Sequence, residues 1–532
     1  MALPQTFAKY MTKQPLAQAR RALAAILIIA TGPLGPVAAL PAAAQLARPA
    51  GQQPVQLALP TLGDGSDLTP SEERRLGDRI IRELYRDPDY IDDPVLVEYV
   101  QNIWQPLMTA ARARGELSPE LEERFAWEIL LGKDRSVNAF ALPGGYMGVH
   151  LGLIGVVSSR DELASVLAHE MSHVTQRHIS RLMTQQSRQT PWLIGAMILG
   201  ALAASKSPDA ANALVVGGQA VAAQNQLNFS RDMEREADRV GYGVMTQAGY
   251  SGQGFVSMFE KLQNASRIND NGSFPYLRSH PLTTQRIADM QSRQHMDAAA
   301  AVPVPLAIDH AMLAARARVL SNPGADVLRL WVAEPDTQVF KTMEPARQAA
   351  SLYAATRASI QQREFERART LLARLADVTR NDPAAARQAR LLSAELELAA
   401  GNPQRTLEIL AGSPPQRPEL VLQTQARLQT SKGPDMTNAL QTWLATHPRD
   451  ATVWQLLAAT YRQNQQPLRA VRAEAEAQVA HLDYGAALDR FRAGQELVRQ
   501  GGASASDHVE ASIIDTRARE VQAVLKEQAA ER

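Results

Sequence analysis

The chain has 532 residues, 45% of them hydrophobic, which is enough material for more than one hydrophobic core. A formal net charge of +1 argues against a nucleic-acid partner, which would require a basic surface. Cysteine is absent, which excludes disulfides, cysteine-ligated zinc, a thiol nucleophile and a lipid-modified N-terminal cysteine.

Residues 1–44 have the features of a signal peptide for export. Basic residues precede a short apolar run over 22–31, which Gly and Pro residues interrupt. A helix that crosses a bilayer needs about 20 apolar residues, so a permanent anchor is disfavoured. Small residues at 42–44 offer a cleavage site. We expect a flexible leader over 45–67 and a soluble exported protein, located in the periplasm if the host has two membranes.

Helix and strand patterns follow this leader. Apolar residues at helical spacing predict one helix that begins at Thr69 and a second helix over 94–113. Residues 127–131 predict a strand, and residues 137–149 predict a strand, a glycine turn and a second strand. The edge of such a hairpin can bind an extended peptide backbone by strand addition. A purely structural hairpin is the alternative.

An H-E-x-x-H motif from His169 to His173 follows, in a helical segment that Ser159 and Glu162 introduce as a capping box. Because residues i and i+4 lie on one face of a helix, the two imidazoles can point at one ion. Glu170 then lies beside a metal-bound water. Zinc held by two histidines and a carboxylate lowers the pKa of such a water to about 7. The motif predicts a zinc-dependent peptidase, and ordinary surface histidines are the alternative.

A third zinc ligand has to come from another segment. His178 lies five residues after His173, swung away on the same helix, and we expect it at the surface or behind a ligand. Glu234 and Asp238 are spaced i and i+4 on a second predicted helix. Glu234 can ligate zinc while Asp238 accepts an N–H from a zinc histidine and fixes its orientation. A solvated helix with Glu–Arg pairs is the alternative.

The segment 191–223, between the two metal helices, contains apolar runs that are too short to span a bilayer. We expect a core hairpin over the active site, since apolar runs are usually core. Peripheral contact with a membrane surface or with an apolar substrate is the alternative.

Three motifs in this order resemble one zinc peptidase family. They are H-E-x-x-H at 169–173, E-x-x-A-D at 234–238 and the Ser-His-Pro segment at 279–286; the strand at 138–141 with its Gly-Gly turn also matches. The family includes the CAAX prenyl endopeptidase and the beta-barrel assembly-enhancing proteases, and the resemblance covers about residues 68–300. The export signal, the lack of a transmembrane bundle and helical repeats downstream favour the second branch.

The resemblance implies one Zn²⁺ per chain on His169, His173 and Glu234. It implies that Glu170 is the general base. It also implies that His280 can approach the metal, occupy the water position and keep the enzyme latent, with an ordinary loop histidine as the alternative. Arg286 would hydrogen-bond a developing oxyanion or brace the site, and bracing is the preferred interpretation.

The second half changes in composition and predicts helices only. Turn-like segments begin at 401, 433 and 465, which are 32 residues apart, close to the tetratricopeptide period of about 34. The opening pattern of that repeat is matched by Trp454, Leu457, Ala458 and Tyr461. We predict a linker over 301–342 and a tetratricopeptide-repeat domain over 343–525, whose concave face suits protein segments. A generic helical bundle is the alternative.

The predicted fold class is mainly α with a small β-sheet: a zincin-type metallopeptidase domain over 68–300, then an α-solenoid of tetratricopeptide-like repeats. The predicted function is a zinc metalloendopeptidase acting on misfolded or stalled exported proteins. The repeats would recruit these clients or the outer-membrane assembly machinery, a context that the resemblance supplies. A repeat-based chaperone or adaptor with a dormant peptidase is the alternative, and the intact ligand set disfavours it.

Overall fold

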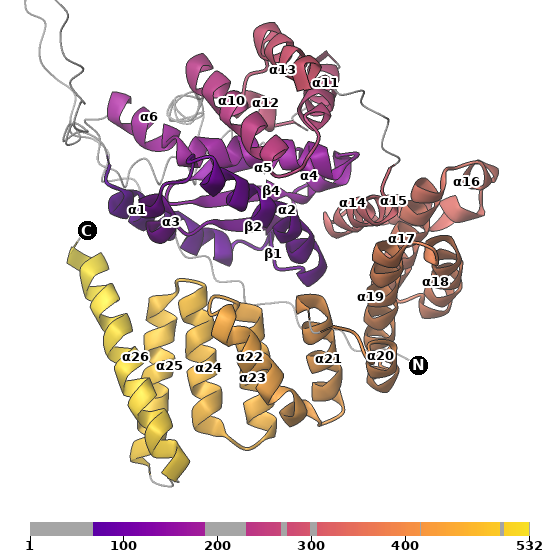
Figure 1. The fold of residues 1–532 in the computed structure, drawn as a ribbon. Helices are drawn as coiled ribbons and strands as arrows, with labels where there is room; N and C mark the ends of the chain where they lie inside the picture. The colour runs from indigo at the N-terminus through magenta and orange to yellow at the C-terminus, as the bar shows by residue number, and fades with distance from the viewer. Residues whose placement is uncertain are drawn as a thin grey trace, which may run out of the picture. The chain divides into compact units, whose positions relative to one another are not determined.

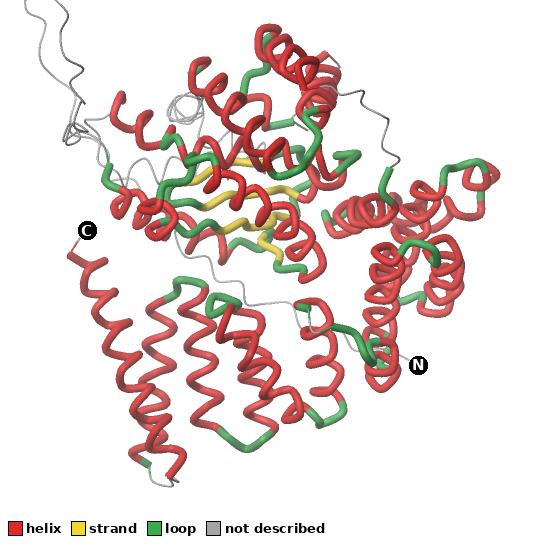
Figure 2. Tube along the Cα trace, viewed as in Figure 1, coloured by secondary structure: helices red, strands yellow, loops and turns green. Residues whose placement is uncertain are grey.

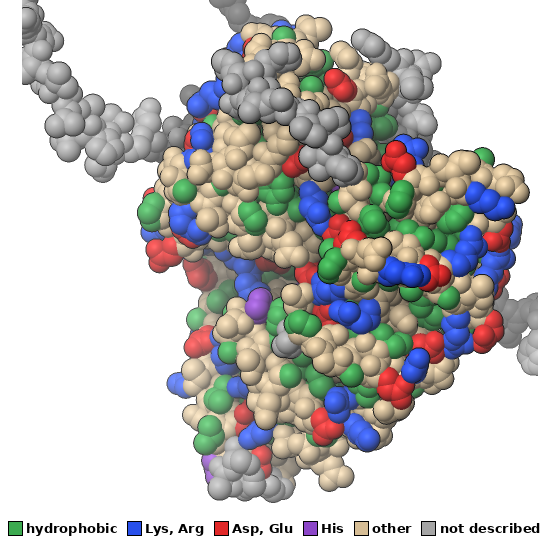
Figure 3. All heavy atoms as spheres, turned by 45° about the vertical axis from the view of Figure 1, so that its right-hand side comes forward, with side chains coloured by type: hydrophobic (Ala, Val, Ile, Leu, Met, Phe, Trp, Pro, Cys, Tyr) green, Lys and Arg blue, Asp and Glu red, His purple; other side chains and the backbone are tan. Residues whose placement is uncertain are grey.

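The computed structural model describes residues 68–186, 230–267, 274–297, 306–414, 416–500 and 505–530 (Figure 1). The predicted export signal, the leader and the apolar segment 191–223 lie outside the described residues. On the face drawn in Figure 3, acidic and basic side chains are interspersed, in agreement with a net charge close to zero. Among the described helices, none combines the length and the apolarity needed to cross a bilayer.

The described chain begins with two helices, and each starts directly after a residue that caps it. α1 (Pro70–Arg86) starts with a capping box, in which the side chains of Thr69 and Glu72 accept each other's backbone N–H. α2 (Pro94–Ala113) starts at Asp93, whose carboxylate accepts the Leu96 N–H at 2.9 Å. Both helices agree with the prediction, and the apolar face of α2 is buried in the largest core.

The strands described here form one four-stranded sheet in the order β1-β2-β4-β3 (Figure 2). β2 pairs in parallel with β4, and the other pairs are antiparallel. The predicted strand and hairpin are confirmed to within a residue or two at each end. The strands are β1 (Tyr90–Ile91), β2 (Glu128–Gly132), β3 (Ala139–Leu142) and β4 (Tyr146–His150).

The turn between β3 and β4 requires its two glycines. Gly144 and Gly145 have φ of 75° and 83°, a region that L side chains rarely adopt. A Cβ at Gly144 would also lie 2.6 Å from the Cα of Arg74 on α1. The turn is therefore packed tightly against α1, and it places β3 at an edge of the sheet, in contact with α5 (Arg160–Thr175).

The capping of α5 differs from the prediction in one respect. Ser159 is the N-cap and accepts the Glu162 N–H, as expected. The Glu162 carboxylate, however, accepts the Ser158 N–H and the Lys261 ammonium, each at 2.6 Å, instead of the Ser159 N–H. The predicted hydrogen bond from the Ser159 N–H back to Glu162 is therefore wrong, because Lys261 on a neighbouring helix is a charged competitor for that carboxylate.

Four helices cover the rest of this region, together with the short α3 (Pro119–Arg124) and α4 (Leu151–Val156). They are α6 (His178–Gln186), α10 (Arg231–Gln247), α11 (Gln253–Arg267) and α13 (Thr284–Asp297), with a single turn α12 (Tyr276–Ser279) before α13. α10 and α11 pack against α5. A Cβ at Gly241 on α10 would lie 3.0 Å from the Ala168 carbonyl, so this glycine allows the two helices to approach closely beside His169.

From residue 306 on, the described residues form helices that pack consecutively as stacked pairs, consistent with repeats (Figure 1). The longer ones are α14 (Ile308–Leu320), α15 (Ala325–Ala333), α17 (Pro345–Gln361), α18 (Phe365–Thr379), α19 (Pro383–Ala399), α20 (Pro403–Ile409), α21 (Arg417–Gln429), α22 (Thr437–Thr446), α23 (Ala451–Gln463), α24 (Pro467–Ala480), α25 (Tyr484–Arg499) and α26 (Ala505–Ala530). The side chains of the predicted repeat opening, Leu457, Ala458 and Tyr461, are buried with Ala470 in one core cluster.

The segment expected as a linker differs from that expectation. α14 packs against α17, and its Met312 and Val319 are buried in the same core cluster as Tyr353. This helix is buried around nearly its whole circumference, charged residues such as Arg316 included, so its sequence shows little amphipathic contrast. The domain limits at 44, 67, 300 and 342 stay predictions.

Candidate metal centre

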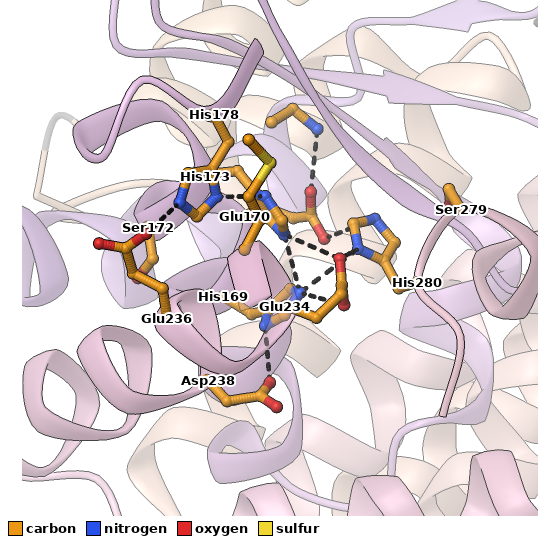
Figure 4. Close-up of polar contacts among 12 residues, drawn as sticks. His169, Glu170, Ser172, His173, His178, Glu234, Glu236, Asp238, Ser279 and His280 are labelled. Atoms are coloured by element: carbon orange, nitrogen blue, oxygen red, sulfur yellow. Dashed lines mark hydrogen bonds and ion pairs between the residues drawn. The ribbon is translucent and has the colours of Figure 1, made fainter. Parts of the chain in front are cut away.

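α5 brings the first two candidate ligands together. His169 and His173 are one helical turn apart and fully buried, and their Nε2 atoms lie 3.0 Å from each other (Figure 4). α5 can present both to the interior because it is buried along nearly its whole length, between the edge strand β3 and the helices α10 and α11.

α10 supplies the carboxylates. The two Glu234 oxygens lie 3.5 Å from the Nε2 atoms of His169 and His173, one each. One turn further along, the Asp238 carboxylate lies 3.0 Å from Nδ1 of His169, on the side of the ring away from Glu234. The solvated charged helix considered above is wrong for these two residues, since both side chains are only 2% exposed.

His280 completes a group of four. Its Nδ1 lies 3.0 Å from Glu234 and 3.4 Å from Nε2 of His169, and its Nε2 lies 3.4 Å from the Glu170 carboxylate. The imidazole stacks on the ring of Tyr276, with centroids 4.6 Å apart. A histidine that follows a short helical turn thus reaches the interior across 111 residues of sequence from His169.

These four side chains fit a zinc ion. Each offers one ligand atom, and these atoms all lie within 4.8 Å of one another. Zn–N and Zn–O bonds of about 2.0–2.2 Å in a tetrahedral site imply ligand atoms roughly 3.3–3.6 Å apart. The contacts described above between these four side chains are 3.0–3.5 Å long, close to that range. Electron pairs that converge in this way inside a core need a cation. The ligand set, His169, His173 and Glu234 with His280, makes one zinc-binding site.

Burial and charge tune the acids of this centre in opposite directions. Burial raises the pKa of the Glu170 carboxyl above its ordinary value, although His280 and His169 oppose it. Burial would raise the pKa of Glu234 as well, but the facing His280 and His169 hold that pKa well below its ordinary value. Glu234 is therefore an anion suited to a ligand, whereas Glu170 is a carboxylate that takes up a proton more readily.

Arg286 braces the carboxylates. Its guanidinium donates to both Asp238 oxygens at 2.6 and 2.8 Å and lies 2.7 Å from Glu234. It also donates to the Pro281 carbonyl at 2.9 Å, which ties α13 to the chain just after His280. Each of these contacts joins Arg286 to another part of the protein and holds that part in place.

Glu170 lies between the ligands and the edge strand. Its Oε2 accepts the backbone N–H of Ala141 on β3 at 2.9 Å, while Oε1 lies near His280. β3 is thus an edge strand placed directly beside the metal centre.

His178 is the residue that the sequence pattern located least well. It is buried, and its Nδ1 lies 2.9 Å from Nδ1 of His173. α5 ends at Thr175, and Arg177 has a φ of 53°, so the chain bends and returns His178 to the face of His173. The expectation of one continuous helix is therefore wrong, as is a place at the surface, whereas the other expected place, behind a zinc ligand, agrees with the contact to His173. Neither glycine nor proline marks this bend in the sequence.

The sheet, the paired α5 and α10 helices and the His/His/Glu centre define a zincin-type metallopeptidase. Residues 98–294 match the profile of Peptidase family M48. This region of the chain is therefore similar to the peptidases of that family.

Relatives extend the match beyond this region. A Vibrio cholerae protein is 33% identical over 62% of this chain and 65% of its own length. The beta-barrel assembly-enhancing protease of Escherichia coli K12 is 28% identical over 81% of this chain and 86% of its own length. The mitochondrial metalloendopeptidase OMA1 of Saccharomyces cerevisiae is 28% identical over 36% of this chain and 54% of its own length. The chain therefore spans just under two thirds of the Vibrio relative and about half of the yeast one.

Proposed function

We propose that this chain is a periplasmic zinc endopeptidase that hydrolyses peptide bonds of misfolded or stalled exported proteins during outer-membrane protein assembly. The buried cluster of His169, His173, Glu234 and His280 carries the catalytic part of this proposal. The name of the Escherichia coli relative, which matches 81% of this chain, supports the assembly part through its reference to beta-barrel assembly.

The chain's own groups suit peptide hydrolysis. Bound zinc supplies a Lewis acid that polarises the scissile carbonyl and acidifies water. Glu170 takes a proton from the attacking water and passes it to the leaving amine, a role suited to a carboxyl whose pKa burial has raised. The edge strand β3 binds the client backbone by strand addition, which requires Ala141 to exchange its contact with Glu170 for one with substrate. Asp238 holds the His169 ring, and Arg286 holds Asp238.

His280 acts as a latch in this scheme. It lies within reach of three members of the centre, Glu234, His169 and Glu170. With zinc held by His169, His173 and Glu234, His280 would take the position that a catalytic water needs. Activity then requires the segment after α12 to move, and its attachment to Arg286 through the Pro281 carbonyl is one contact that has to be released.

The stacked helices after residue 306 recruit clients or the assembly machinery. Stacked pairs provide an extended surface for protein segments, and the relatives named for beta-barrel assembly support this assignment. A chaperone or adaptor with a dormant peptidase is the competing function. A complete ligand set disfavours it, because a dormant site is under no constraint to keep four converging side chains.

Cleavage of unfolded clients by the purified full-length protein tests the proposal. We expect zinc at one ion per chain and cleavage of an unfolded outer-membrane barrel protein and of casein, abolished by a chelator. His280→Ala should cut faster than wild type, because the latch is gone. The same barrel protein in its folded form is the control substrate, and it should resist cleavage. If zinc-loaded wild type and zinc-loaded His280→Ala both leave every unfolded substrate intact, the peptidase is inactive and the chaperone or adaptor function is the correct one.

A further inference from the structure

We propose that His178 and Glu236 are positioning residues for the zinc ligand His173, forming a second outer support that parallels the one at His169. The inference rests on the metal centre and not on the proposed client class. It concerns how firmly and in which orientation the second imidazole of H-E-x-x-H is held.

Both zinc imidazoles make their outer contact through the same ring nitrogen, Nδ1. Nε2 of His169 and of His173 face Glu234, each at 3.5 Å. Nδ1 of His169 lies 3.0 Å from Asp238, and Nδ1 of His173 lies 2.9 Å from Nδ1 of His178 (Figure 4). Each ring thus turns one nitrogen toward the ligand cluster and holds the other in an outer contact. At His169 that contact is a carboxylate, whereas at His173 it is another imidazole.

The second support continues outward to a charged pair. Nε2 of His178 lies 3.0 Å from Oε2 of Glu236, and the same oxygen accepts from Nη1 of Arg181 at 2.8 Å. The side chain of His178 is 0% exposed, that of Glu236 31% and that of Arg181 43%. Glu236 comes from α10, between Glu234 and Asp238, and Arg181 comes from α6. The bend at Arg177 brings these two helices into one line of contacts.

The geometry assigns a direction to the protons. A zinc ligand uses the lone pair of Nε2, so His173 carries its proton on Nδ1 and donates it to Nδ1 of His178. His178 accepts there, so its own proton is on Nε2 and is donated to the Glu236 carboxylate. Asp238 contacts the His169 ring directly, whereas the Glu236 carboxylate reaches His173 only through the ring of His178. Outer partners of this kind typically contribute 10- to 100-fold in metal affinity.

Zinc affinity of the full-length protein, measured without substrate, tests the inference. His178→Phe keeps a buried ring but removes the acceptor, and we expect its zinc dissociation constant to rise about 10- to 100-fold. His178→Gln has an oxygen to accept from His173 and an N–H₂ to donate to Glu236, so most of the affinity should return. The visible spectrum of the Co²⁺-loaded protein should change in His178→Phe and revert in His178→Gln.

His310→Phe is the matched control. His310 is also a buried imidazole, but it contacts Tyr99 and the Val157 carbonyl instead of the metal centre, so zinc affinity should stay at the wild-type value. A folded His178→Phe protein with wild-type zinc affinity and Co²⁺ spectrum would overturn the inference. If His178→Phe does not fold, Glu236→Leu, at a partly exposed position, takes its place: weaker zinc binding supports the inference, and unchanged binding overturns it. Because no substrate is present, failure of the proposed client class leaves this result unaffected.

Discussion

The metal centre and the cluster around Arg316 are both buried and both rich in carboxylates, but they are completed in different ways. Arg316 donates to both oxygens of Asp93 at 2.8 and 2.6 Å and to both oxygens of Glu395 at 3.0 and 2.7 Å. Its Nη1 also donates to the Tyr353 hydroxyl at 3.0 Å. In the metal centre, by contrast, lone pairs of His169, His173 and Glu234 converge on one point.

Burial of charge is therefore a poor indicator of function, and the balance of donors and acceptors is a better one. The Arg316 cluster joins α14, the N-cap of α2 and α19, and it contains the guanidinium N–H groups that its carboxylates need. In the metal centre Arg286 supplies a cation to Glu234 and Asp238, but the converging imidazole nitrogens of His169 and His173 still offer lone pairs to a metal ion. Loss of a residue should change stability in the first cluster and chemistry in the second.

Glu170→Gln should show the largest effect, a loss of cleavage rate without a loss of zinc binding or stability. Glu170 is not among the four converging ligands, so zinc affinity and unfolding temperature should stay at wild-type values. Cleavage of an unfolded substrate should fall by about 10²- to 10⁴-fold, because the amide cannot accept the proton from water. Zinc content, measured on the same preparation, is the control. Cleavage at the wild-type rate would remove Glu170 from the mechanism.

Arg316→Met should show the reverse pattern. It leaves Asp93 and Glu395 buried without their cation, which costs about 3–5 kcal/mol of unfolding free energy. Zinc affinity should not change. Urea unfolding measures the loss, and Arg329→Met is the control, since Arg329 is 68% exposed and pairs with an exposed Asp326. That control should stay within about 0.5 kcal/mol of wild type. Equal losses in the two variants would contradict the distinction drawn here.

The smallest expected effect concerns His310, a buried imidazole outside both clusters. Burial lowers the pKa of His310 below its ordinary value, although the Val157 carbonyl opposes it. A folded-state pKa below the unfolded value of about 6.5 means that its contribution to stability is fully present above that pH. The contribution is lost as the pH falls through the folded pKa. The difference in unfolding free energy between wild type and His310→Phe should therefore shrink below about pH 6.5. A difference that is constant from pH 8 to 5 would contradict this assignment.

Local sequence patterns located the elements that carry the site. Helical spacing and an N-cap placed His169 and His173 on one face of α5, and the i, i+4 spacing placed Glu234 and Asp238 on one face of α10. The bounds of α2 and the Gly-Gly hairpin also followed from residues within a few positions of each other. These features are governed by capping, turn chemistry and apolar periodicity, which act over short stretches of chain.

The packing of distant segments determined the rest. Whether Glu234 reached the two imidazoles depended on the close crossing of α5 and α10 at Gly241, and the approach of His280 was inferred from a resemblance instead of from spacing. The helix break before His178 was not predicted, because a non-glycine residue, Arg177, adopts a positive φ where the sequence shows no break. Such a conformation is unfavourable for the isolated chain, and contacts with residues far along the sequence stabilise it, here those of Arg177 with Glu73 and of His178 with Glu236.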